Sequence, residues 1–521
     1  KSVRLDNVAA NQRVYVDYDP SHVLYEYPSK KTQALFKTKD NSVFFTHQEN
    51  SFNDFDQEGL LYNKLSEEGP AFAVGDINAD GLEDLFVGGG KGQSAQIYLQ
   101  KKNAEFTPKG NAVFQKDAAF EDTAATLVDI DGDSDLDLIV GSGGNQQTEM
   151  LNYKTRIYLN DGRGNFNVSE QVLPSNRTNI SVIKAADYDN DGDQDLFIGS
   201  RSVAGVYGVD PNHLLLENNG KGQFEDVSKR NAFDLKNAGM VTDALWVDIN
   251  TDGNIDLITV SDWGSPKIFQ SNGKQLILQS SELDELTGWW NTIESVDIDK
   301  DGDLDFILGN QGENIHYKPS QAQAIRMFIN DFDANGSIEQ IVCIAQENGD
   351  YPIHQKREIT AQLVSLKKQN LKASDYARRN IQDLFGPDLL RSAIVKEVRY
   401  SSSILLINEN GRFTSKALPP RAQFSCICDI SCSDVNNDGH LDLITVGNDH
   451  EFKPQFSRLD ASYGDVFLGD GQNNFTWMTA ENSGISIKGE AKHLAKIKSA
   501  DNKELLVVIR NNMKPLLYEA Q

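Results

Sequence analysis

Short apolar segments of four to six residues recur along most of the chain, and each lies beside a turn rich in Asp, Asn and Gly. Examples are DLIVGS at 137–142, DLFIGS at 195–200 and DFILGN at 305–310. These segments are too short for helices, and they are rich in the β-branched and aromatic residues that favour strands. The pattern therefore predicts an all-β protein built from many short strands.

One acidic turn occurs seven times, with the template D-x-[DN]-x-[DN]-G-x-x-[DE]. The copies begin at Asp76, Asp129, Asp187, Asp248, Asp297, Asp331 and Asp434. The second copy departs from the template, because Ser134 stands where the others have Gly. Each turn lies between two apolar segments, so we expect a strand–loop–strand arrangement.

The spacing of the oxygen-bearing residues predicts calcium sites. Side-chain oxygens at positions 1, 3, 5 and 9 of a tight loop can converge on one cation, and position 7 can supply its backbone carbonyl. Hard oxygen donors with three or four carboxylates favour calcium over zinc or copper, while magnesium prefers a rigid octahedron and retained waters. An EF-hand is excluded, because none of the copies has the bidentate Glu at position 12.

We therefore expect up to seven calcium ions, one in each loop. The candidate ligands are Asp76, Asn78, Asp80, Leu82 and Asp84; Asp129, Asp131, Asp133, Asp135 and Asp137; Asp187, Asp189, Asp191, Asp193 and Asp195; Asp248, Asn250, Asp252, Asn254 and Asp256; Asp297, Asp299, Asp301, Asp303 and Asp305; Asp331, Asp333, Asn335, Ser337 and Glu339; and Asp434, Asn436, Asp438, His440 and Asp442.

A second hairpin follows several of the acidic loops, at 156–168, 214–227, 404–415 and 466–477. Four-stranded units that repeat roughly every 50 residues are typical of a β-propeller. The segment 493–519 keeps the apolar pattern without the acids, so we expect a metal-free last blade that takes its outer strand from 34–50. The loops at Asp297 and Asp331 are so close that only a shortened blade fits between them. Counting that unit separately gives eight blades, the count we favour, and merging it with its neighbour gives seven.

The segment 354–398 interrupts the repeat. Ile359, Leu363 and Leu366 recur at helical spacing, Ser374 is a candidate helix N-cap, and Gly386 with the following proline would end a helix. We expect two or three helices that project from one face of the propeller. This is the most basic part of the chain, so it is a candidate partner surface, and a lid packed over neighbouring blades is an equal alternative.

Composition limits the classes of partner and the cellular locations that we expect. The chain has 77 acidic and 50 basic residues, a formal net charge of −27, and such a surface repels nucleic acid. No apolar run approaches the roughly 20 residues that span a bilayer. The first residues look like part of a folded domain rather than a signal peptide, so we expect either a cytosolic chain or the processed part of a secreted precursor. Cys343, Cys426, Cys428 and Cys432 lack a zinc-site pattern and are expected to be buried thiols, with one disulfide as the alternative.

The repeats resemble the FG-GAP and VCBS repeats of integrin α-subunit propellers and secreted bacterial proteins. Residues 44–521 more specifically resemble propeller proteins of Bacteroidetes that carry an ASPIC/UnbV domain and are related to cartilage acidic protein. The matching stretches lie at 68–89, 288–312, 375–385 and 458–471, and VRLDNVAANQRVYVD at 3–17 resembles the tail of the ASPIC/UnbV domain itself. The resemblance implies a domain tail and linker at 1–32, a propeller at 33–521, and a longer precursor.

Members of this family are similar to surface lipoproteins encoded near SusC/SusD-type TonB-dependent transporters. The resemblance thus implies an accessory or scaffold role in an outer-membrane assembly, peripheral to the membrane and with protein partners. Loops of this kind typically bind calcium at roughly 10⁻⁴–10⁻³ M. Free calcium in the cytosol would leave them empty, which favours an exported protein at the bacterial outer membrane or cell surface, or in the periplasm or extracellular space.

An enzyme is the weaker hypothesis. The histidines lie in no recognisable catalytic motif, and calcium would occupy the paired carboxylates that could otherwise act as general acids. Two alternatives stay open, a lectin-like glycan-binding propeller and a lyase resembling the calcium-bearing rhamnogalacturonan lyases. Both would use aromatic side chains in pockets, to which Trp263, Trp289 and Trp290 are candidate contributors, although packing within or between blades is their more common role.

Overall fold

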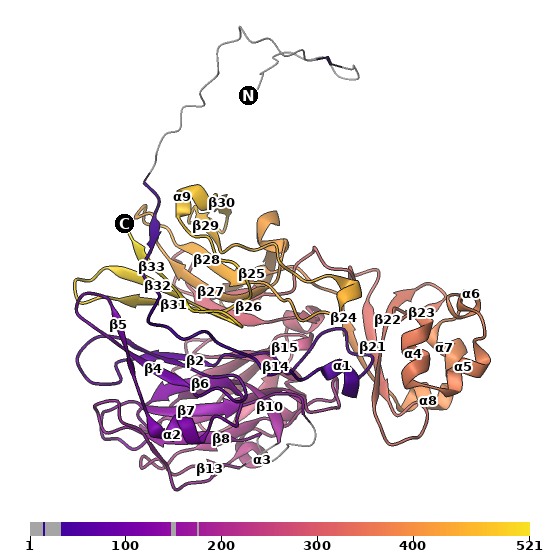
Figure 1. Ribbon diagram of the computed structural model, residues 1–521, viewed down its shortest axis with the longest axis horizontal. Helices are drawn as coiled ribbons and strands as arrows, with labels where there is room; N and C mark the ends of the chain where they lie inside the picture. Colours follow the sequence, from indigo (N-terminus) through magenta and orange to yellow (C-terminus); the bar gives the residue numbers. More distant parts are fainter. Residues whose placement is uncertain (1–13, 16–32, 147–152, 175–176) are drawn as a thin grey trace.

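The computed structural model describes residues 14–15, 33–146, 153–174 and 177–521. Apart from Val14 and Tyr15, the predicted domain tail and linker at 1–32 lies outside the described residues. In the described residues the strands form antiparallel sheets, most of them four-stranded, and the helices are short. This confirms the all-β prediction and the four-stranded unit, and the architecture is β-propeller-like (Figure 1).

Six sheets follow the expected order of strand, acidic loop, strand, strand, turn and strand. They contain β2 (Phe72–Gly75), β3 (Asp84–Val87), β4 (Gln96–Gln100) and β5 (Phe106–Lys109); β6 (Asp122–Val128), β7 (Asp137–Ser142), β8 (Thr155–Leu159) and β9 (Asn167–Val168); β10 (Thr178–Ala186), β11 (Asp195–Val203), β12 (Leu214–Glu217) and β13 (Glu225–Asp226); β14 (Met240–Val247), β15 (Asp256–Gly264), β16 (Lys267–Ser271) and β17 (Leu276–Gln279), with β18 (Gly288–Trp289) paired to β15; β19 (Thr292–Val296), β20 (Asp305–Gly309), β25 (Ile404–Glu409) and β26 (Arg412–Ala417); and β27 (Ile427–Ser433), β28 (Asp442–Gly447), β29 (Asp465–Gly469) and β30 (Phe475–Met478).

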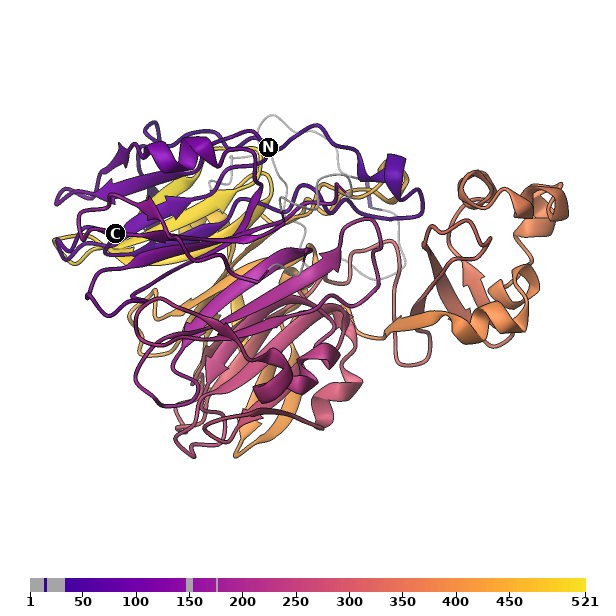
Figure 2. The same ribbon diagram turned by 90° about the horizontal axis from the view of Figure 1, so that it is seen from below.

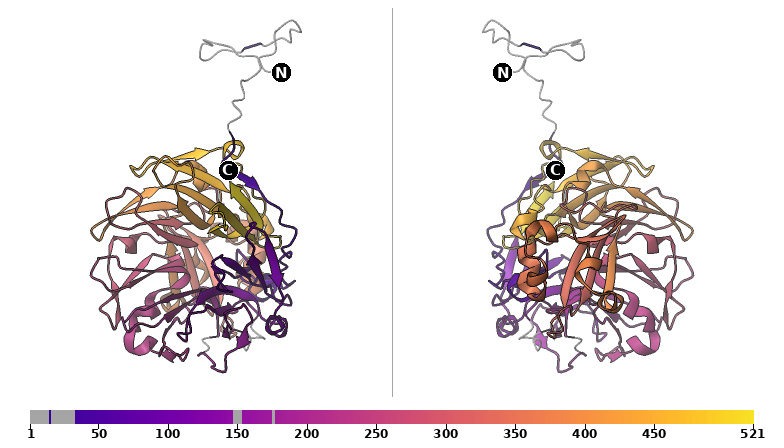
Figure 3. Two further views of the ribbon diagram at one scale, coloured as in Figure 1. Left: turned by 90° about the vertical axis from the view of Figure 1, so that its left-hand side faces the viewer. Right: turned by 90° about the vertical axis from the view of Figure 1, so that its right-hand side faces the viewer.

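A seventh sheet joins the two ends of the described chain. It holds β31 (Ala491–Lys498), β32 (Glu504–Arg510) and β33 (Leu516–Ala520), and its outer strand is β1 (Phe36–Thr38). Phe36 pairs with Ala520 and Thr38 with Tyr518 in an antiparallel register, so the C-terminus lies beside the segment that contains β1 (Figure 3). This pairing covers an edge of β33 that would otherwise be exposed.

The first strands of these sheets contact one another in chain order. β2 contacts β6, which contacts β10, and the sequence continues through β14, β19 and β27 to β31. Separate apolar clusters fill the spaces between adjacent sheets; one of them joins Ile139 of β7 to Ile180 of β10 and Leu196 of β11. Another joins Leu85 of β3 to Leu505 and Val507 of β32, so the seventh sheet packs on the first.

The eighth sheet projects from the rest of the molecule (Figure 2). It has the strand order β23 (Gly349–Pro352), β22 (Glu339–Gln346), β21 (Ile325–Asn330) and β24 (Ile394–Val398), and its acidic loop joins β21 to β22. The chain leaves for this sheet after β20 and returns before β25. The two ends of this excursion meet, because the N–H of Gly312 donates to the carbonyl of Ser401 at 2.7 Å. We call residues 312–401 the projecting subdomain.

Five short helices cover one face of the projecting sheet: α4 (Lys356–Gln362), α5 (Ser365–Gln369), α6 (Ala373–Tyr376), α7 (Ile381–Leu384) and α8 (Pro387–Ser392). They are more numerous and shorter than the two or three helices expected, and the last residues of the predicted insertion form β24 instead. Ile359, Leu363 and Leu366 pack with Phe328 and Ile341 of the sheet. These three positions therefore serve the helical core that their spacing predicted.

The remaining helices of the described residues are short, each with three to five residues. They are α1 (Asp54–Gln57), α2 (Ala112–Lys116), α3 (Ser228–Asn231) and α9 (Ala480–Ser483), with 3₁₀ turns η2 (Phe233–Asn237), η3 (Glu282–Glu285), η4 (Pro420–Gln423) and η5 (Pro454–Phe456). Among the described residues, no helix has both the length and the apolar character needed to cross a membrane.

Candidate metal centres

Each acidic loop folds around the carboxylate at its first position. In the loop that begins at Asp187, one oxygen of Asp187 accepts the N–H of Asp191 at 3.0 Å and the other accepts the N–H of Gly192 at 3.0 Å. The loops that begin at Asp76, Asp248, Asp297, Asp331 and Asp434 repeat both bonds. The side chain at position 5 accepts the N–H of position 7 in all seven loops.

The glycine of the template is required by backbone conformation and not by space. Gly192 has φ of 98°, a region that residues with a Cβ rarely adopt, yet a Cβ there would meet nothing within 4 Å. Ser134 occupies the same position in the second copy with φ of 74°. The loop keeps its shape despite the strain of this substitution, and its Gly lies two residues earlier, at Gly132 with φ of 78°.

The acid at position 9 is buried in every loop and connects the loop to its sheet. Asp137 accepts the N–H of Ile130 within the loop at 3.3 Å and the N–H of Asn160, just beyond β8, at 2.9 Å. The bond to the third strand, or to the residue that follows it, recurs at Asp84, Asp195, Asp256, Asp305 and Asp442. Position 9 therefore has a structural role that does not depend on a metal, which the spacing of the template does not reveal.

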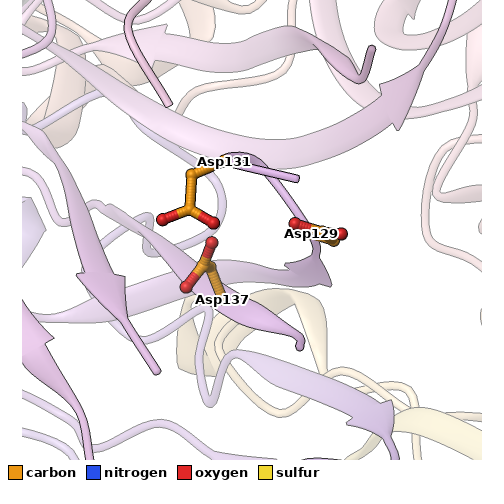
Figure 4. A group of neighbouring side chains, drawn as sticks. All are labelled: Asp129, Asp131 and Asp137. Atoms are coloured by element: carbon orange, nitrogen blue, oxygen red, sulfur yellow. The ribbon is translucent and has the colours of Figure 1, made fainter. Parts of the chain in front are cut away.

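Four loops bring three carboxylates together. The acids at positions 1, 3 and 9 have oxygens within 4.8 Å of one another in the groups Asp129, Asp131 and Asp137 (Figure 4); Asp187, Asp189 and Asp195; Asp297, Asp299 and Asp305; and Asp331, Asp333 and Glu339. One oxygen of each of Asp189, Asp299 and Asp333 is buried without a hydrogen-bond partner. A buried carboxylate oxygen without a partner is costly, so these donor sets fit a hard divalent cation.

The other three loops have Asn at position 3. Asn250 accepts the N–H of Asp252 at 3.0 Å and donates its amide to the carboxylate of the same residue at 2.9 Å, and Asn436 does the same with Asp438. The predicted ligands of these loops lie in the same loop fold, but they do not form a group of three neighbouring carboxylates.

Burial shifts the titration of the position-9 acids. Desolvation, and to a smaller extent the neighbouring loop carboxylates, raise the pKa of Asp84 and of Asp137 to about 7 and that of Asp195 to about 8. The backbone N–H donors act in the opposite direction. A divalent cation in the loop would favour the ionised form of each acid. Cation binding would therefore offset the cost of ionising these buried carboxylates.

The sequence does not reveal a belt of polar side chains around the centre of the sheets. Thr123, Ser181 and Thr242 stand at bulges in β6, β10 and β14. Thr123 and Ser181 donate to backbone carbonyls of the next sheet at 2.5 and 2.6 Å, and Thr242 donates to the carbonyl of Trp290, just before β19, at 2.8 Å. Asn291 continues the series with an amide that donates to the carbonyl of Ile427 at 3.1 Å. Only the bulges, which shift side chains off the two-residue alternation, place these residues together.

Two further sets of predicted residues can be placed. Cys428 stands at the corresponding bulge of β27, and its sulfur lies 3.8 Å from that of Cys426; all four cysteines are free thiols, two of them buried and two half-buried. Of the candidate aromatic contributors, Trp290 is fully buried and donates to the carbonyl of Leu286 at 2.9 Å. Trp263 packs edge to face on Trp289.

Comparison with protein families supports the repeat. Residues 76–140, 129–198 and 248–308 match the FG-GAP-like repeat. The chain carries FG-GAP-like repeats. The matched ranges contain the loops from Asp76, Asp129, Asp187, Asp248 and Asp297, whereas those from Asp331 and Asp434 lie outside them.

A search of curated proteins finds no match. Among solved structures, the chain is similar to the V. cholerae biofilm matrix protein Bap1, with 10% identity and a TM-score of 0.37 over 93% of this chain and 91% of that one. It is also similar to BBS1N in complex with ARL6DN, with 9% identity and a TM-score of 0.41 over 94% and 98% of the two chains. The fold assignment therefore rests on the sheets and the repeats described above.

Proposed function

We propose that this protein is a calcium-stabilised, non-enzymatic interaction scaffold that acts outside the cytoplasm. The proposal rests on a contrast between two parts of the molecule. The body, which is the seven sheets outside residues 312–401, is acidic and carries repeated acidic loops, whereas the projecting subdomain has a different composition. The body is the rigid part, because its acidic loops and the belt of cross-sheet hydrogen bonds tie neighbouring strands together. The projecting subdomain is the part that a partner can reach.

The body is best described as a seven-bladed propeller. The projecting sheet is inserted between two strands of one blade, since the chain leaves after β20 and returns at β25. The seventh blade combines β31–β33 with β1 and packs on the first. In this description the unit at Asp331, which the sequence favoured as an eighth blade, belongs to the projecting subdomain.

The projecting subdomain has the surface of a protein-binding element. Residues 354–398 contain nine basic and five acidic residues, a formal net charge of +4 within a chain of −27. Beside its exposed lysines, Val364 and Leu371 keep 63% and 80% of their surface in contact with solvent. A basic surface with protruding aliphatic side chains suits an acidic protein partner. Opposite charges increase the rate of association, and the apolar contacts stabilise the complex.

The finer form of the proposal names the partner. Following the family resemblance, we propose an outer-membrane assembly of the SusC/SusD type as the partner to test first. A native pull-down from outer membranes, with the captured proteins identified by mass spectrometry, tests this. Capture of a TonB-dependent transporter would support it, and a pull-down that contains partners but no such transporter would refute this finer form.

A charge-reversal variant tests the surface itself. Lys367, Lys368 and Lys372 are exposed on and beside α5, so changing all three to Glu should abolish capture without lowering the melting temperature. The matched control changes Lys101, Lys102 and Lys221, three exposed lysines of the body, to Glu. Equal capture by the two variants would show that the projecting subdomain is not the binding surface.

A further inference from the structure

An aromatic pocket lies where the projecting subdomain joins the body. Its walls come from the segment 311–317, which leads out of β20 toward β21, and from the segment 452–459. Tyr62 and Trp289 complete the lining. Ligand sites typically have predominantly apolar walls with a few polar groups.

Three residues that line this pocket each have a buried polar atom without a hydrogen-bond partner. These atoms are the indole nitrogen of Trp289, the hydroxyl of Tyr317 and the amide oxygen of Gln311, on side chains that expose 4%, 6% and 9% of their surface. A buried donor or acceptor without a partner costs about 1–3 kcal/mol, and folded proteins rarely contain several in one place. Their occurrence on residues around one pocket is the reason to look for a ligand or an ordered water there.

The other tryptophans of the chain show that this is not a general property of the fold. Trp246, Trp263, Trp290 and Trp477 each donate the indole N–H to an oxygen at 2.9–3.2 Å. Trp289 is the fifth tryptophan of the chain, and it is the one that lines the pocket. The indole N–H without a partner is therefore found at the tryptophan that lines the pocket, and it is not a general property of the tryptophans in this chain.

The backbone around the pocket is also strained. Ser457 has φ of 62° and ψ of 154°, a conformation that is otherwise adopted almost only by glycine and costs about 1–3 kcal/mol. Trp263, which packs on Trp289, has φ of 55°. Strain of this kind persists where the surrounding structure holds a functional geometry in place.

We propose that this pocket binds a neutral pyranose ring of a glycan. The rings of His316, Tyr317 and Phe456 lie with centroids 5.1–5.4 Å apart and form one aromatic wall. Arg458 is paired with Asp460 at 3.3 Å, which partly offsets its charge and favours a neutral ligand over an anion. A pyranose presents an apolar C–H face to such a wall, and its hydroxyls both donate and accept hydrogen bonds, which matches the unpaired groups.

Binding of simple sugars tests the proposal. The probes are the methyl glycosides of glucose, galactose, mannose and rhamnose and their linear oligosaccharides, added to the full chain in calcium and followed by tryptophan fluorescence and calorimetry. At least one series should bind. Tyr317→Phe should weaken that binding about tenfold, the effect of one lost hydrogen bond, and Phe456→Ala should weaken it through loss of the wall.

Stability of the free protein supplies the second readout. Because the hydroxyl of Tyr317 has no partner, Tyr317→Phe should leave the melting temperature unchanged or raise it. The matched control is Tyr207→Phe, which removes a buried hydroxyl that donates to Asp262 at 2.6 Å and should lower it. The proposal is overturned if none of the sugars binds at millimolar concentration, if aromatic peptides bind in their place, or if the two variants destabilise the protein equally.

Discussion

The loops that begin at Asp187 and Asp248 lie in neighbouring sheets and share the same backbone shape, but they differ in how their oxygens are satisfied. In the first loop, one oxygen of each of Asp189 and Asp193 is buried without a partner. In the second, the amide of Asn250 closes onto Asp252 and the carboxylate of Asp256 accepts the N–H groups of Ile249 and Ser271. One template therefore produces two kinds of loop, one that is incomplete without a cation and one that is largely satisfied by its own hydrogen bonds.

From this difference we infer that the residue at position 3 determines how much a loop is destabilised without a cation. Where position 3 is Asp, three carboxylates at positions 1, 3 and 9 crowd together, and their mutual repulsion is relieved only by protonation or by a cation. Where it is Asn, the loop holds one negative charge fewer and its amide donates a bond. The following predictions test this distinction.

Removal of calcium should have the largest effect. At 1 mM calcium and a dissociation constant of about 10⁻⁴ M, each occupied loop stabilises the folded chain by about 1.4 kcal/mol, so the four loops with Asp or Glu at positions 1, 3 and 9 contribute about 6 kcal/mol together. Thermal unfolding in excess chelator should therefore begin several degrees lower than in calcium. An unchanged melting temperature would contradict structural calcium, and restoration by calcium but not by equal ionic strength of sodium chloride is the control.

Substitution at position 9 should separate the two kinds of loop. In calcium, Asp195→Asn should cost about 3 kcal/mol, because it removes a buried charge that both the cation and the backbone use. Asp256→Asn should cost less, since its loop is satisfied without a cation. The difference should disappear in chelator, and two variants that are equally destabilised in calcium would show that position 3 does not matter.

Acid should destabilise the sheet of the Asp187 loop through a buried histidine. His213 accepts the N–H of Ser200 at Nδ1 and lies 3.0 Å from the carbonyl of Gly239 at Nε2. Burial lowers its pKa from 6.5 to about 4. The unfolded chain binds this proton more readily, so the stability from neutral His213 is present above pH 6.5 and is lost as the pH falls toward 4, by about 3 kcal/mol.

Comparison of the wild type with His213→Gln measures that contribution. With calcium saturating, the melting temperature of the wild type should fall more steeply between pH 6.5 and 4 than that of the variant. His316, whose side chain is exposed, supplies the control substitution His316→Gln, which should keep the wild-type slope. Parallel slopes for the wild type and His213→Gln would refute the assignment.

Exchange of the position-3 residues should change the melting temperature least of these variants. The direction of the change should differ between calcium and chelator, which makes this the most specific test. Asp189→Asn should weaken calcium binding at its loop about tenfold and Asn250→Asp should strengthen it at the other, because each changes the ligand charge by one. In chelator the effects on the melting temperature should reverse, since Asp189→Asn then relieves repulsion and Asn250→Asp adds it. Calcium titration and paired melting curves check both halves, and effects of the same sign in both media would contradict the distinction.

Several features of this molecule follow from local chemistry and could be predicted. The acidic template predicted seven loops between paired strands, and the glycine or serine at position 6 has the positive φ that a tight turn requires. The apolar pattern predicted four-stranded units and strands within 493–519. Helical spacing at Ile359, Leu363 and Leu366 identified the helical face that packs on the projecting sheet.

Other features depend on contacts between residues far apart in the chain, and no local pattern carries them. The bulges that turn Thr123, Ser181 and Thr242 toward the next sheet arise from register shifts between paired strands. The departure of the projecting subdomain between β20 and β25 ends at the close approach of Gly312 and Ser401. The spacing of the Asp331 loop does not reveal that its sheet is inserted between two strands of another sheet.

Residue types and short spacings therefore determined where the chain turns, which acids gather in each loop and which segments are strands, because the residues of a turn interact within about ten positions. The tertiary structure alone decided which of those oxygens are left without partners and which tryptophan lines a pocket, because burial and the supply of hydrogen-bond partners are set by segments hundreds of residues apart. Trp289 and Trp290 are adjacent in the chain, yet the indole N–H of one has a partner and that of the other has none.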